Sequence, residues 1–402
     1  MSSQNTARIA GRATGLALLI PMTLSTMAIV LLAPILPKLM EEFRDVPNYQ
    51  YLVPMILTIP ALCVAILSPV AGALGDYFGR RKLLISAMAV YGVVGLAPLF
   101  LQSLTSILIS RIGVGISEAI IMTLSTTLIA DFFKGGNRSK WLAGQTAVAS
   151  VSATCFFILG GYLGQFGWRM PFVIYSTAFL MLIAVLVFTW EIEEEKGEDG
   201  EVHQLQSASW TGFPWKHMLG VVLVTVFASV LFYTVQIQSA PGLVSHGITD
   251  SFKIGWMSAL ASIGVPLGTF IYSRNAKRPI ELLLLIEFSL LAVGFVVMSN
   301  APSAWGFLGG CALNQIGAGM LLPTLLVWAV TGLSFEFRGR GTGIWQGVFA
   351  LGQWLSPIVI TLLSLRFGGL ISSFQFLGYA SAIAAILAVV LLWKTSKTVN
   401  AA

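Results

Sequence analysis

Long apolar segments recur along the whole chain, and they constrain its fold more than any other feature. Hydrophobic residues make up 56% of the 402 residues and charged residues only 10%, whereas an ordinary soluble domain is roughly 25% charged. About 20 apolar residues in a helix cross the roughly 30 Å hydrocarbon core of a bilayer. Because backbone groups in lipid must be satisfied within the segment, each such run predicts a transmembrane helix.

Twelve segments are long enough to span a membrane. We expect them at residues 14–36, 51–73, 83–101, 106–128, 141–164, 170–190, 217–238, 252–273, 281–300, 305–330, 342–363 and 371–393. The first run is too long for the apolar region of a signal peptide, so we interpret it as a span. The predicted fold is an all-α integral membrane protein, with the lipid bilayer as its main solvent.

The longest polar segment divides the spans into two sets of six. It covers residues 191–216 and begins with the acidic run EIEEEKGEDGE, which is typical of a solvated linker. We predict an N-terminal six-helix bundle over 1–190, a cytoplasmic linker over 191–216 and a C-terminal six-helix bundle over 217–402. RIGVG at 111–115 also matches QIGAG at 315–319 in register, which favours a duplicated six-helix unit.

Basic residues are distributed unevenly between the two faces of the predicted bundle. Seventeen Lys and Arg residues lie on the face that holds the N-terminus, five on the other, and one within a span. Cytoplasmic loops carry the excess of basic residues, so both termini should be cytoplasmic in a multi-pass protein of the cell (inner) membrane. The net charge of +6 is therefore a topology signal, and we expect no nucleic-acid partner.

A glycine-rich basic motif, GALGDYFGRRK at residues 72–82, follows the second predicted span. Glycines allow a tight turn and close helix approach, and an aspartate can pair with an arginine. The motif resembles the signature G-x-L-x-D-R-x-G-R-R-K of the major facilitator superfamily, with Tyr77 in place of a basic residue. This resemblance implies two six-helix bundles and a conformational latch between them, formed by Gly72, Asp76, Gly79 and Arg80.

The fourth predicted span contains two charged residues, Arg111 and Glu118, within RIGVGISEA. A charge in hydrocarbon costs roughly 2.5–3.5 kcal/mol, so both side chains should point into the bundle. Seven residues make about two helical turns, which places them on one face. The Arg-x-x-x-Gly spacing resembles a second superfamily motif linked to proton coupling, and the resemblance implies that role for both residues. A polar pair that only fixes helix packing is the alternative.

Polar and aromatic residues within the later spans predict a partly apolar substrate cavity. They are Tyr233, Gln236, Gln238, Asn314, Gln315, Trp328, Trp345, Gln346 and Gln353. Hydrogen bonding between helices is the alternative for each of them. Glu287 also lies in a span, but the resemblance places its helix at the periphery.

Secondary transport is the function that these features favour. We expect no enzyme activity, cofactor or metal site, because the chain has no G-x-x-x-x-G-K-[ST] loop and no H-E-x-x-H spacing. A receptor function on a transporter fold is a further alternative, because a fold does not fix a function. The segment LAPILPKL resembles the first helix of drug/proton antiporters, although the fifth span keeps only the final Gly160-Gly161 of their motif.

The first hypothesis is proton-coupled efflux of lipophilic or amphipathic small molecules, with protons and the substrate as partners of a monomer. The alternative is proton-coupled uptake or exchange of an organic anion or lipid-like metabolite, because residues 115–119 also resemble a motif of organic-anion and spinster-type transporters. In that case Arg111 would be the counter-charge.

Overall fold

The computed structural model describes residues 10–191 and 210–400, so most of the predicted linker lies outside the described residues. Every regular element in these ranges is a helix, and the described residues form twelve spans long and apolar enough to cross a membrane. The predicted all-α fold with twelve transmembrane helices is therefore confirmed.

The first six spans run from residue 12 to residue 188. Their helices are α1 (Arg12–Leu19), η1 (Ile20–Met22), α2 (Thr23–Val30), η2 (Ala33–Ile35), α3 (Leu36–Glu42), α4 (Tyr49–Phe78), α5 (Arg80–Leu96), η3 (Ala97–Leu99), α6 (Leu104–Phe132), α7 (Gly135–Gly164), η4 (Met170–Ser176) and α8 (Thr177–Phe188).

The other six spans begin after the linker. Their helices are α9 (Trp215–Ser245), α10 (Ser251–Ser262), α11 (Gly264–Asn275), α12 (Ile280–Asn300), α13 (Ala304–Val330), α14 (Phe335–Phe367) and α15 (Leu370–Asn400). Most helices extend past their apolar runs, because the backbone hydrogen bonds continue where polar residues replace apolar ones. For example, α4 ends at Phe78, five residues beyond the predicted boundary.

Prolines interrupt the first span without ending it. Proline lacks a backbone N–H and clashes with the preceding turn, so it bends a helix. Pro21 and Pro34 each lie at the start of a short 3₁₀ turn, η1 and η2, and the chain continues as α2 and α3. The first span is therefore three helical pieces that follow one another through the bundle.

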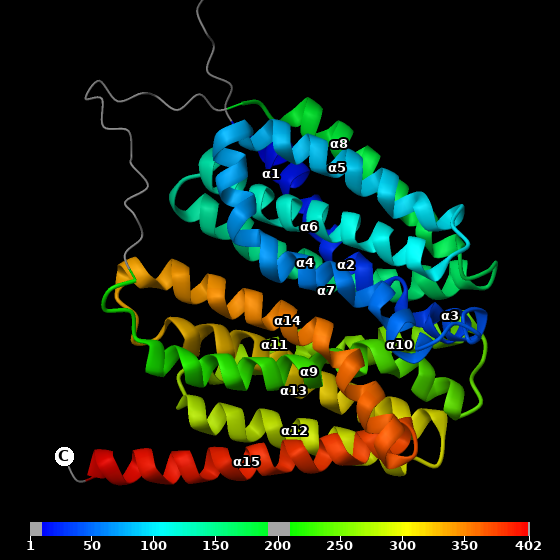
Figure 1. The fold of residues 1–402 in the computed structure, drawn as a ribbon. Helices are drawn as coiled ribbons and strands as arrows, with labels where there is room; N and C mark the ends of the chain where they lie inside the picture. Colours follow the sequence, from blue (N-terminus) through cyan, green and yellow to red (C-terminus); the bar gives the residue numbers. More distant parts are fainter. Residues whose placement is uncertain (1–9, 192–209, 401–402) are drawn as a thin grey trace, which may run out of the picture.

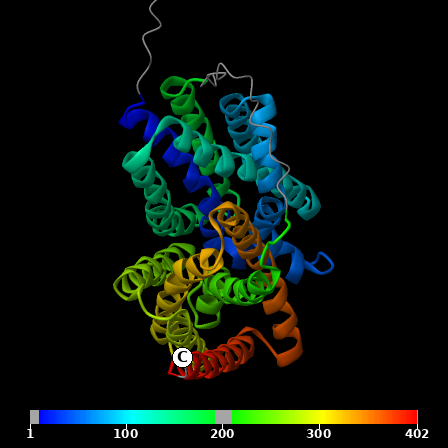
Figure 2. The ribbon, with the colours of Figure 1, turned by 90° about the vertical axis from the view of Figure 1, so that its left-hand side faces the viewer.

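The spans form two stacked halves. Figure 1 shows the helices from α1 to α8 above those from α9 to α15, and the turned view in Figure 2 shows the same separation. Each half has its own apolar core, one centred on residues such as Leu31, Tyr91 and Phe172 and the other on residues such as Leu231, Phe295 and Phe307.

The two halves touch closely on one face of the bundle. We call the face where α8 ends and α9 begins the linker side, and the other face the opposite side. On the opposite side Gly161 of α7 packs directly on α10: a Cβ atom at Gly161 would lie 2.5 Å from Ser251 O and 2.8 Å from Gly255 Cα. Only glycine permits this approach of two backbones.

Candidate functional site

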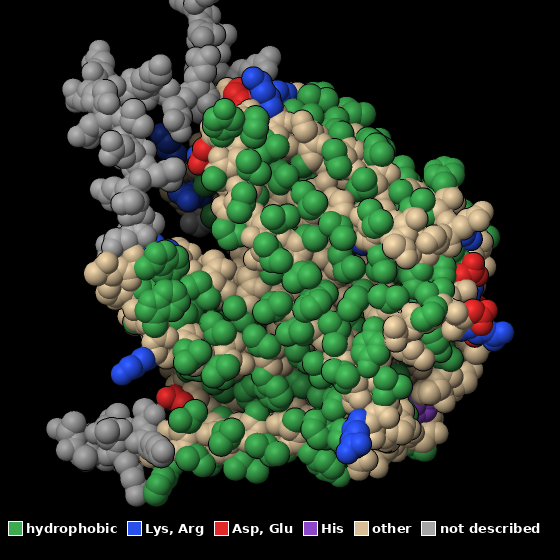
Figure 3. Space-filling view, viewed as in Figure 1, with side chains coloured by type: hydrophobic (Ala, Val, Ile, Leu, Met, Phe, Trp, Pro, Cys, Tyr) green, Lys and Arg blue, Asp and Glu red, His purple; other side chains and the backbone are tan. Residues whose placement is uncertain are grey.

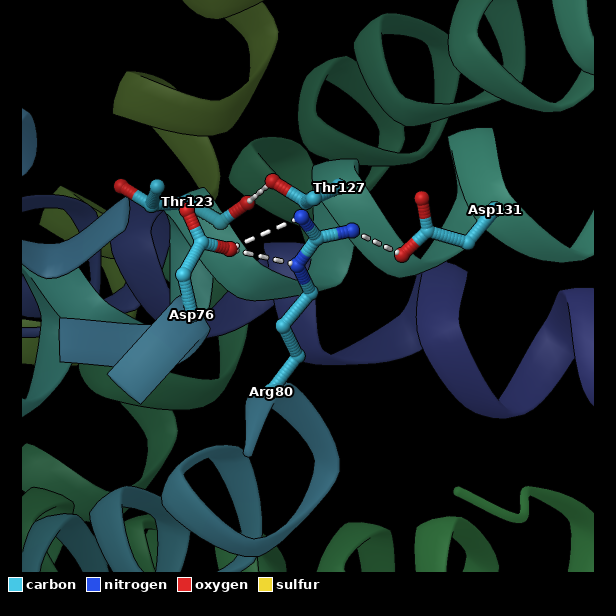
Figure 4. Close-up of polar contacts among 5 residues, drawn as sticks. All are labelled: Asp76, Arg80, Thr123, Thr127 and Asp131. Carbon is cyan, nitrogen blue, oxygen red and sulfur yellow. Dashed lines mark hydrogen bonds and ion pairs between the residues drawn. The ribbon is translucent and has the colours of Figure 1, made fainter. Parts of the chain in front are cut away.

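Arg80 forms the centre of an ion-pair cluster on the linker side. Its Nη2 lies 2.8 Å from Asp76 Oδ1 and its Nη1 lies 2.7 Å from Asp131 Oδ2. Figure 4 shows the guanidinium between the two carboxylates, which belong to α4 and α6. In this conformation, the predicted latch residues Asp76 and Arg80 thus join three helices of the first half, and Arg80 binds no acid of the second half among the described residues.

Asp131 is a member of this cluster that no local sequence pattern predicts. It stands at the start of the run DFFKGGNRSK, 51 residues from Arg80. No periodicity within one helix could pair them, because the contact joins the start of α5 to the end of α6. An acid at a helix end near a basic loop was the available signal.

The two predicted latch glycines differ in their surroundings. Gly79 joins α4 to α5 with φ of +90°, a conformation that favours glycine, and a Cβ there would lie 2.9 Å from Glu191 Oε1. Gly72 lies inside α4, where the nearest atom to a Cβ would be Thr123 Cγ2 at 3.9 Å. The turn therefore requires Gly79 for its backbone, whereas the space around Gly72 would admit a small side chain.

Arg111 is fully buried among neighbouring helices of the first half, with an exposed fraction of 0%. Its Nη2 donates to the carbonyl oxygens of Val94 and Gly95 at 3.2 and 3.3 Å. The guanidinium also lies 5.2 and 4.9 Å from the ring centroids of Phe172 and Tyr175. These contacts fix α6 against α5 and η4, which is what a helix-packing cation does.

Glu118 lies two turns along α6 from Arg111, but no hydrogen bond or ion pair joins the two side chains within the described residues. Only 4% of Glu118 is exposed, and its Oε2 has no partner among the described residues. Arg111 and Glu118 were predicted to share one face of the helix, but their side chains are not linked by polar contacts. Glu118 is instead a buried acid with unused hydrogen-bonding capacity, which is a functional candidate by default within a membrane.

A cavity of about 890 Å³ separates the two halves on the linker side. Its walls come from η1, α4 and α6 of the first half and from α14 of the second, together with Trp210. Figure 3 shows the molecular surface hollowed between the halves on this side. Apolar side chains such as Leu62, Met122 and Leu351 dominate the lining, and hydroxyls such as Ser68 and Thr126 interrupt it.

Glu118 lies close to the inner end of this cavity. Met122 lines the cavity from α6, and Glu118 precedes it by four residues on the same helix face. The rise of 1.5 Å per residue puts their Cα atoms about 6 Å apart along the axis. A small inward extension of the cavity would therefore reach the acid.

One of the nine residues predicted for the substrate cavity, Gln346, lines it in this conformation. Three others form a polar cluster inside the second half. Gln236 Nε2 donates to Gln315 Oε1 at 2.9 Å, and Gln315 Nε2 lies 3.5 Å from Asn314 Oδ1. Gln236 and Gln315 also border a small void with Phe157 of the first half.

The remaining five predicted residues do not line the cavity. The ring of Tyr233 lies edge-on to that of Phe349, with 5.5 Å between the ring centroids, and the ring of Trp345 lies tilted against Phe349 with its centroid at 5.8 Å. Gln238 is buried on α9, Gln353 is half-buried on α14, and the carbonyl of Trp328 accepts a hydrogen bond from His217 Nε2. The structure therefore brings together Tyr233 and Trp345 through Phe349.

Several cavity residues could not be predicted from the sequence, because their types are common in membrane helices. Ser68, Thr126 and Thr127 each donate to the carbonyl four residues earlier, as hydroxyls in membrane helices often do. In the sequence, Arg340 contributes only to the excess of basic residues that indicates topology. Their position on the cavity follows from the packing of α4, α6 and α14, which no local pattern reports.

Contacts between the two halves close the opposite side. Besides the approach of Gly161 to α10, Gln165 Nε2 donates to Asp250 Oδ2 at 3.1 Å, and Thr361 Oγ1 donates to Gln50 O at 3.2 Å. Asp250 also accepts the backbone N–H of Lys253 at 2.7 Å and so caps α10. This backbone hydrogen bond, with the Gln165 amide, lowers the pKa of Asp250.

Glu287 of α12 is a second fully buried acid, located within the second half. Its Oε1 lies 2.5 Å from Thr324 Oγ1 of α13, which also lies 3.0 Å from Met320 O. Thr324 belongs to the same half as Glu287, so this contact fixes packing inside that half, and Glu287 Oε2, like Glu118 Oε2, has no partner among the described residues. No group of three or more potential metal ligands occurs among the residues that the structure describes.

The family model of the Major Facilitator Superfamily matches residues 18–334, and the chain therefore belongs to this superfamily. Solved transporter structures share its fold. A bacterial homologue of the human lysosomal transporter Spinster, inward-facing and occupied, matches with a TM-score of 0.72 and 16% identity over 96% of each chain. The xylose transporter XylE from E. coli, inward open, matches with a TM-score of 0.73 and 15% identity over 93% of this chain and 94% of that chain.

A D-xylose-proton symporter also matches, with a TM-score of 0.70 and 16% identity over 94% of this chain and 96% of that one. At these identities the likeness shows the fold alone. The family and its structural neighbours are transporters, so the protein is a membrane transporter and not an enzyme.

Proposed function

We propose that the protein is a proton-coupled secondary transporter of lipophilic or amphipathic small molecules that works by alternating access. The observation that carries this proposal is the cavity between the halves. It is lined from both halves, open to the linker side and closed on the opposite side by the Gly161 contact and the Asp250 and Thr361 hydrogen bonds. Its mostly apolar lining suits a substrate with a large apolar body.

Glu118 is the proposed proton-coupling residue. It lies one turn beyond the cavity residue Met122, and its Oε2 has no partner among the described residues. The ionised form of Glu118 is unfavourable in this buried environment. Proton binding at Glu118 and substrate binding in the cavity can therefore influence one another. We propose that Arg111 supports this role indirectly, by holding α6 against α5 through its two carbonyl contacts.

The latch residues are proposed to act in the change of conformation. Gly72, Asp76, Gly79 and Arg80 lie on the linker side, which is open here, and Arg80 is held by acids of its own half. Closure would bring the second half against this cluster. The polar cluster of Gln236, Asn314 and Gln315 is proposed to meet the substrate when the opposite side opens, because its void borders Phe157 of the first half.

The excess of basic residues on the linker side supports a cytoplasmic position for that side and for both termini in the cell (inner) membrane. Export is the first assignment of direction, and import or exchange is the alternative. Export and import differ in whether substrate binding weakens or strengthens proton binding at Glu118. A cationic substrate and a proton compete for the acid, whereas an anionic substrate and a proton assist each other.

Flux in proteoliposomes under an imposed pH gradient tests this proposal. The panel contains an anionic, a neutral and a cationic amphipath, each measured with the gradient in both directions. We expect at least one of them to accumulate against its own gradient, and a protonophore to abolish the accumulation. If all three equilibrate no faster than in protein-free liposomes under either gradient, the proposal is wrong.

A further inference from the structure

A small void inside the protein is lined mostly by uncharged polar groups. It has a volume of about 10 Å³ and lies where α9, α10 and α13 of the second half meet Phe157 of α7. Such a volume is about the least that holds one water-sized group. The described residues that border it carry no charge, and the polar ones are Gln236, Ser239, Ser258, Ser262 and Gln315. Polar walls of this kind bind a hydrogen-bonding group, whereas apolar voids stay empty.

Gln236 supplies a hydrogen-bond acceptor that no described residue uses. Its Nε2 donates to Gln315 Oε1 at 2.9 Å, but its Oε1 has no partner among the described residues. Only 7% of Gln236 is exposed. A buried amide oxygen without a partner costs about 1–3 kcal/mol. A group that donates to this oxygen would therefore be bound favourably.

Ser239 and Ser258 supply a hydrogen-bond donor to the same void. Their Oγ atoms lie 3.2 Å apart, so one hydroxyl donates to the other. The hydroxyl that accepts this bond keeps its own hydrogen, for which the described part of the chain shows no acceptor. The void therefore borders both an unused acceptor and an unused donor.

A hydroxyl group matches this pair, because an O–H both donates and accepts. A carboxylate only accepts and an ammonium group only donates, so each would leave one of the two protein groups unpaired. A charged group would also meet no counter-charge among the described residues that border the void. The chemistry of the void thus favours an uncharged, hydroxyl-bearing ligand.

Phe157 controls access to the void. It is the only residue of the first half among those described on its wall, and it is 2% exposed. A Cβ atom at Gly255 of α10 would lie 2.5 Å from Phe157 O, so Phe157 belongs to the contact of α7 and α10 that closes the opposite side. Separation of these helices would withdraw the Phe157 ring and expose the polar groups to the opposite side.

We infer that Gln236, Ser239 and Ser258 bind a hydroxyl group of an uncharged substrate head when the opposite side is open. This inference rests on the proposed function and deepens it, because it names the chemistry of the substrate head. An uncharged head neither competes with a proton at Glu118 nor attracts one through charge. Proton and substrate would then be linked through the change of conformation.

Binding of two matched probes tests the inference. One is a fluorescent twelve-carbon β-glucoside, and the other is the same molecule with every hydroxyl O-methylated, so that its head accepts hydrogen bonds but cannot donate them. Both are measured on the full chain in nanodiscs, with empty nanodiscs as background. We expect the glucoside to bind about tenfold more tightly, because the methylated head leaves the buried amide oxygen unpaired.

Gln236→Met removes the amide and keeps the length of the side chain. It should abolish the preference for the glucoside and leave the affinity for the methylated probe within about twofold, which also shows that the variant is folded. Gln238→Met is the matched control, because Gln238 is a buried glutamine of the same helix that does not border the void. We expect this variant to keep the preference.

Two results would overturn the inference. If the wild type binds both probes equally, the void accepts water only and no hydroxyl of a substrate. If Gln236→Met and Gln238→Met lose the preference to the same extent, the amide of Gln236 has no particular part in recognising the head.

Flux measurements separate the inference from the proposed function. Transport of a charged amphipath under a pH gradient, with none of the glucoside, would overturn the inference and leave proton-coupled transport intact. Hydroxyl-dependent binding of the glucoside, with no flux of any probe, would support the site for the head and contradict the transport proposal.

Discussion

Replacement of Gly161 by alanine should open the opposite side of the transporter. In the present conformation a Cβ atom at this position would lie 2.5 Å from Ser251 O and 2.8 Å from Gly255 Cα. Both are backbone atoms, so neither can turn away as a flexible side chain could. The α7 and α10 backbones would have to separate, and this contact joins the two halves.

The cost of the added methyl group falls on one conformation. Overpacking a tight contact costs typically 1–3 kcal/mol. Alternating access separates α7 from α10 when the opposite side opens, so the open state escapes most of this cost. A difference of that size changes the ratio of the two states by about 5- to 150-fold.

Distances between spin labels at Asp45 and Pro302 would report this shift, because these exposed positions lie on the opposite side in different halves. Gly309→Ala is the matched control, since no atom lies within 4 Å of a Cβ at that position. We expect Gly161→Ala to add a longer distance that Gly309→Ala lacks. An unchanged distance distribution in a folded Gly161→Ala protein would show that the close approach of α7 and α10 does not hold the opposite side closed.

Three further predictions concern other parts of the molecule. Asp76→Asn should slow turnover and leave substrate affinity within about twofold, because the cluster lies outside the cavity. Lost equilibrium binding with unchanged steady-state flux would show that Asp76 does not act as a latch. Arg111→Lys should lower the unfolding free energy by about 1–3 kcal/mol, because an ammonium cannot keep both carbonyl bonds and the aromatic stacking; thermal unfolding equal to the wild type would contradict this. Asp250 has a lowered pKa, so its stabilising contact is present above the ordinary aspartate pKa and is lost only as pH falls through the lowered value. Titration of Asp250 should therefore cause no change in the Asp45–Pro302 label distance between about pH 6 and 8. In Asp250→Ala the same distance should lengthen.

The sequence supports the fold far better than it supports the site. Twelve apolar runs are a strong signal because each must satisfy its own backbone, and the structure contains all twelve spans within the described residues. The motif GALGDYFGRRK predicted a tight turn, and the chain turns between α4 and α5 at Gly79, where the positive φ favours glycine. Both signals are local in the chain.

The cavity could not be predicted from local sequence patterns, because its walls come from separate helices. Thr126 and Ser68 are neutral residues that bond to their own helix, and only the packing of α4 and α6 turns them toward a common space. The position of Arg111 shows the same limit. Its spacing from Glu118 predicted one face, but its partners are the carbonyls of Val94 and Gly95 on another helix.

Proton coupling at Glu118 is tested by pH-driven transport in the Glu118→Gln variant. The amide resembles the protonated acid in shape but cannot titrate, and Glu287→Gln is the matched control because it changes a buried acid inside one half. We predict that Glu118→Gln loses accumulation driven by a pH gradient in proteoliposomes but still exchanges substrate across the membrane, whereas Glu287→Gln keeps both activities. Accumulation by Glu118→Gln at the wild-type level would show that Glu118 does not couple transport to protons.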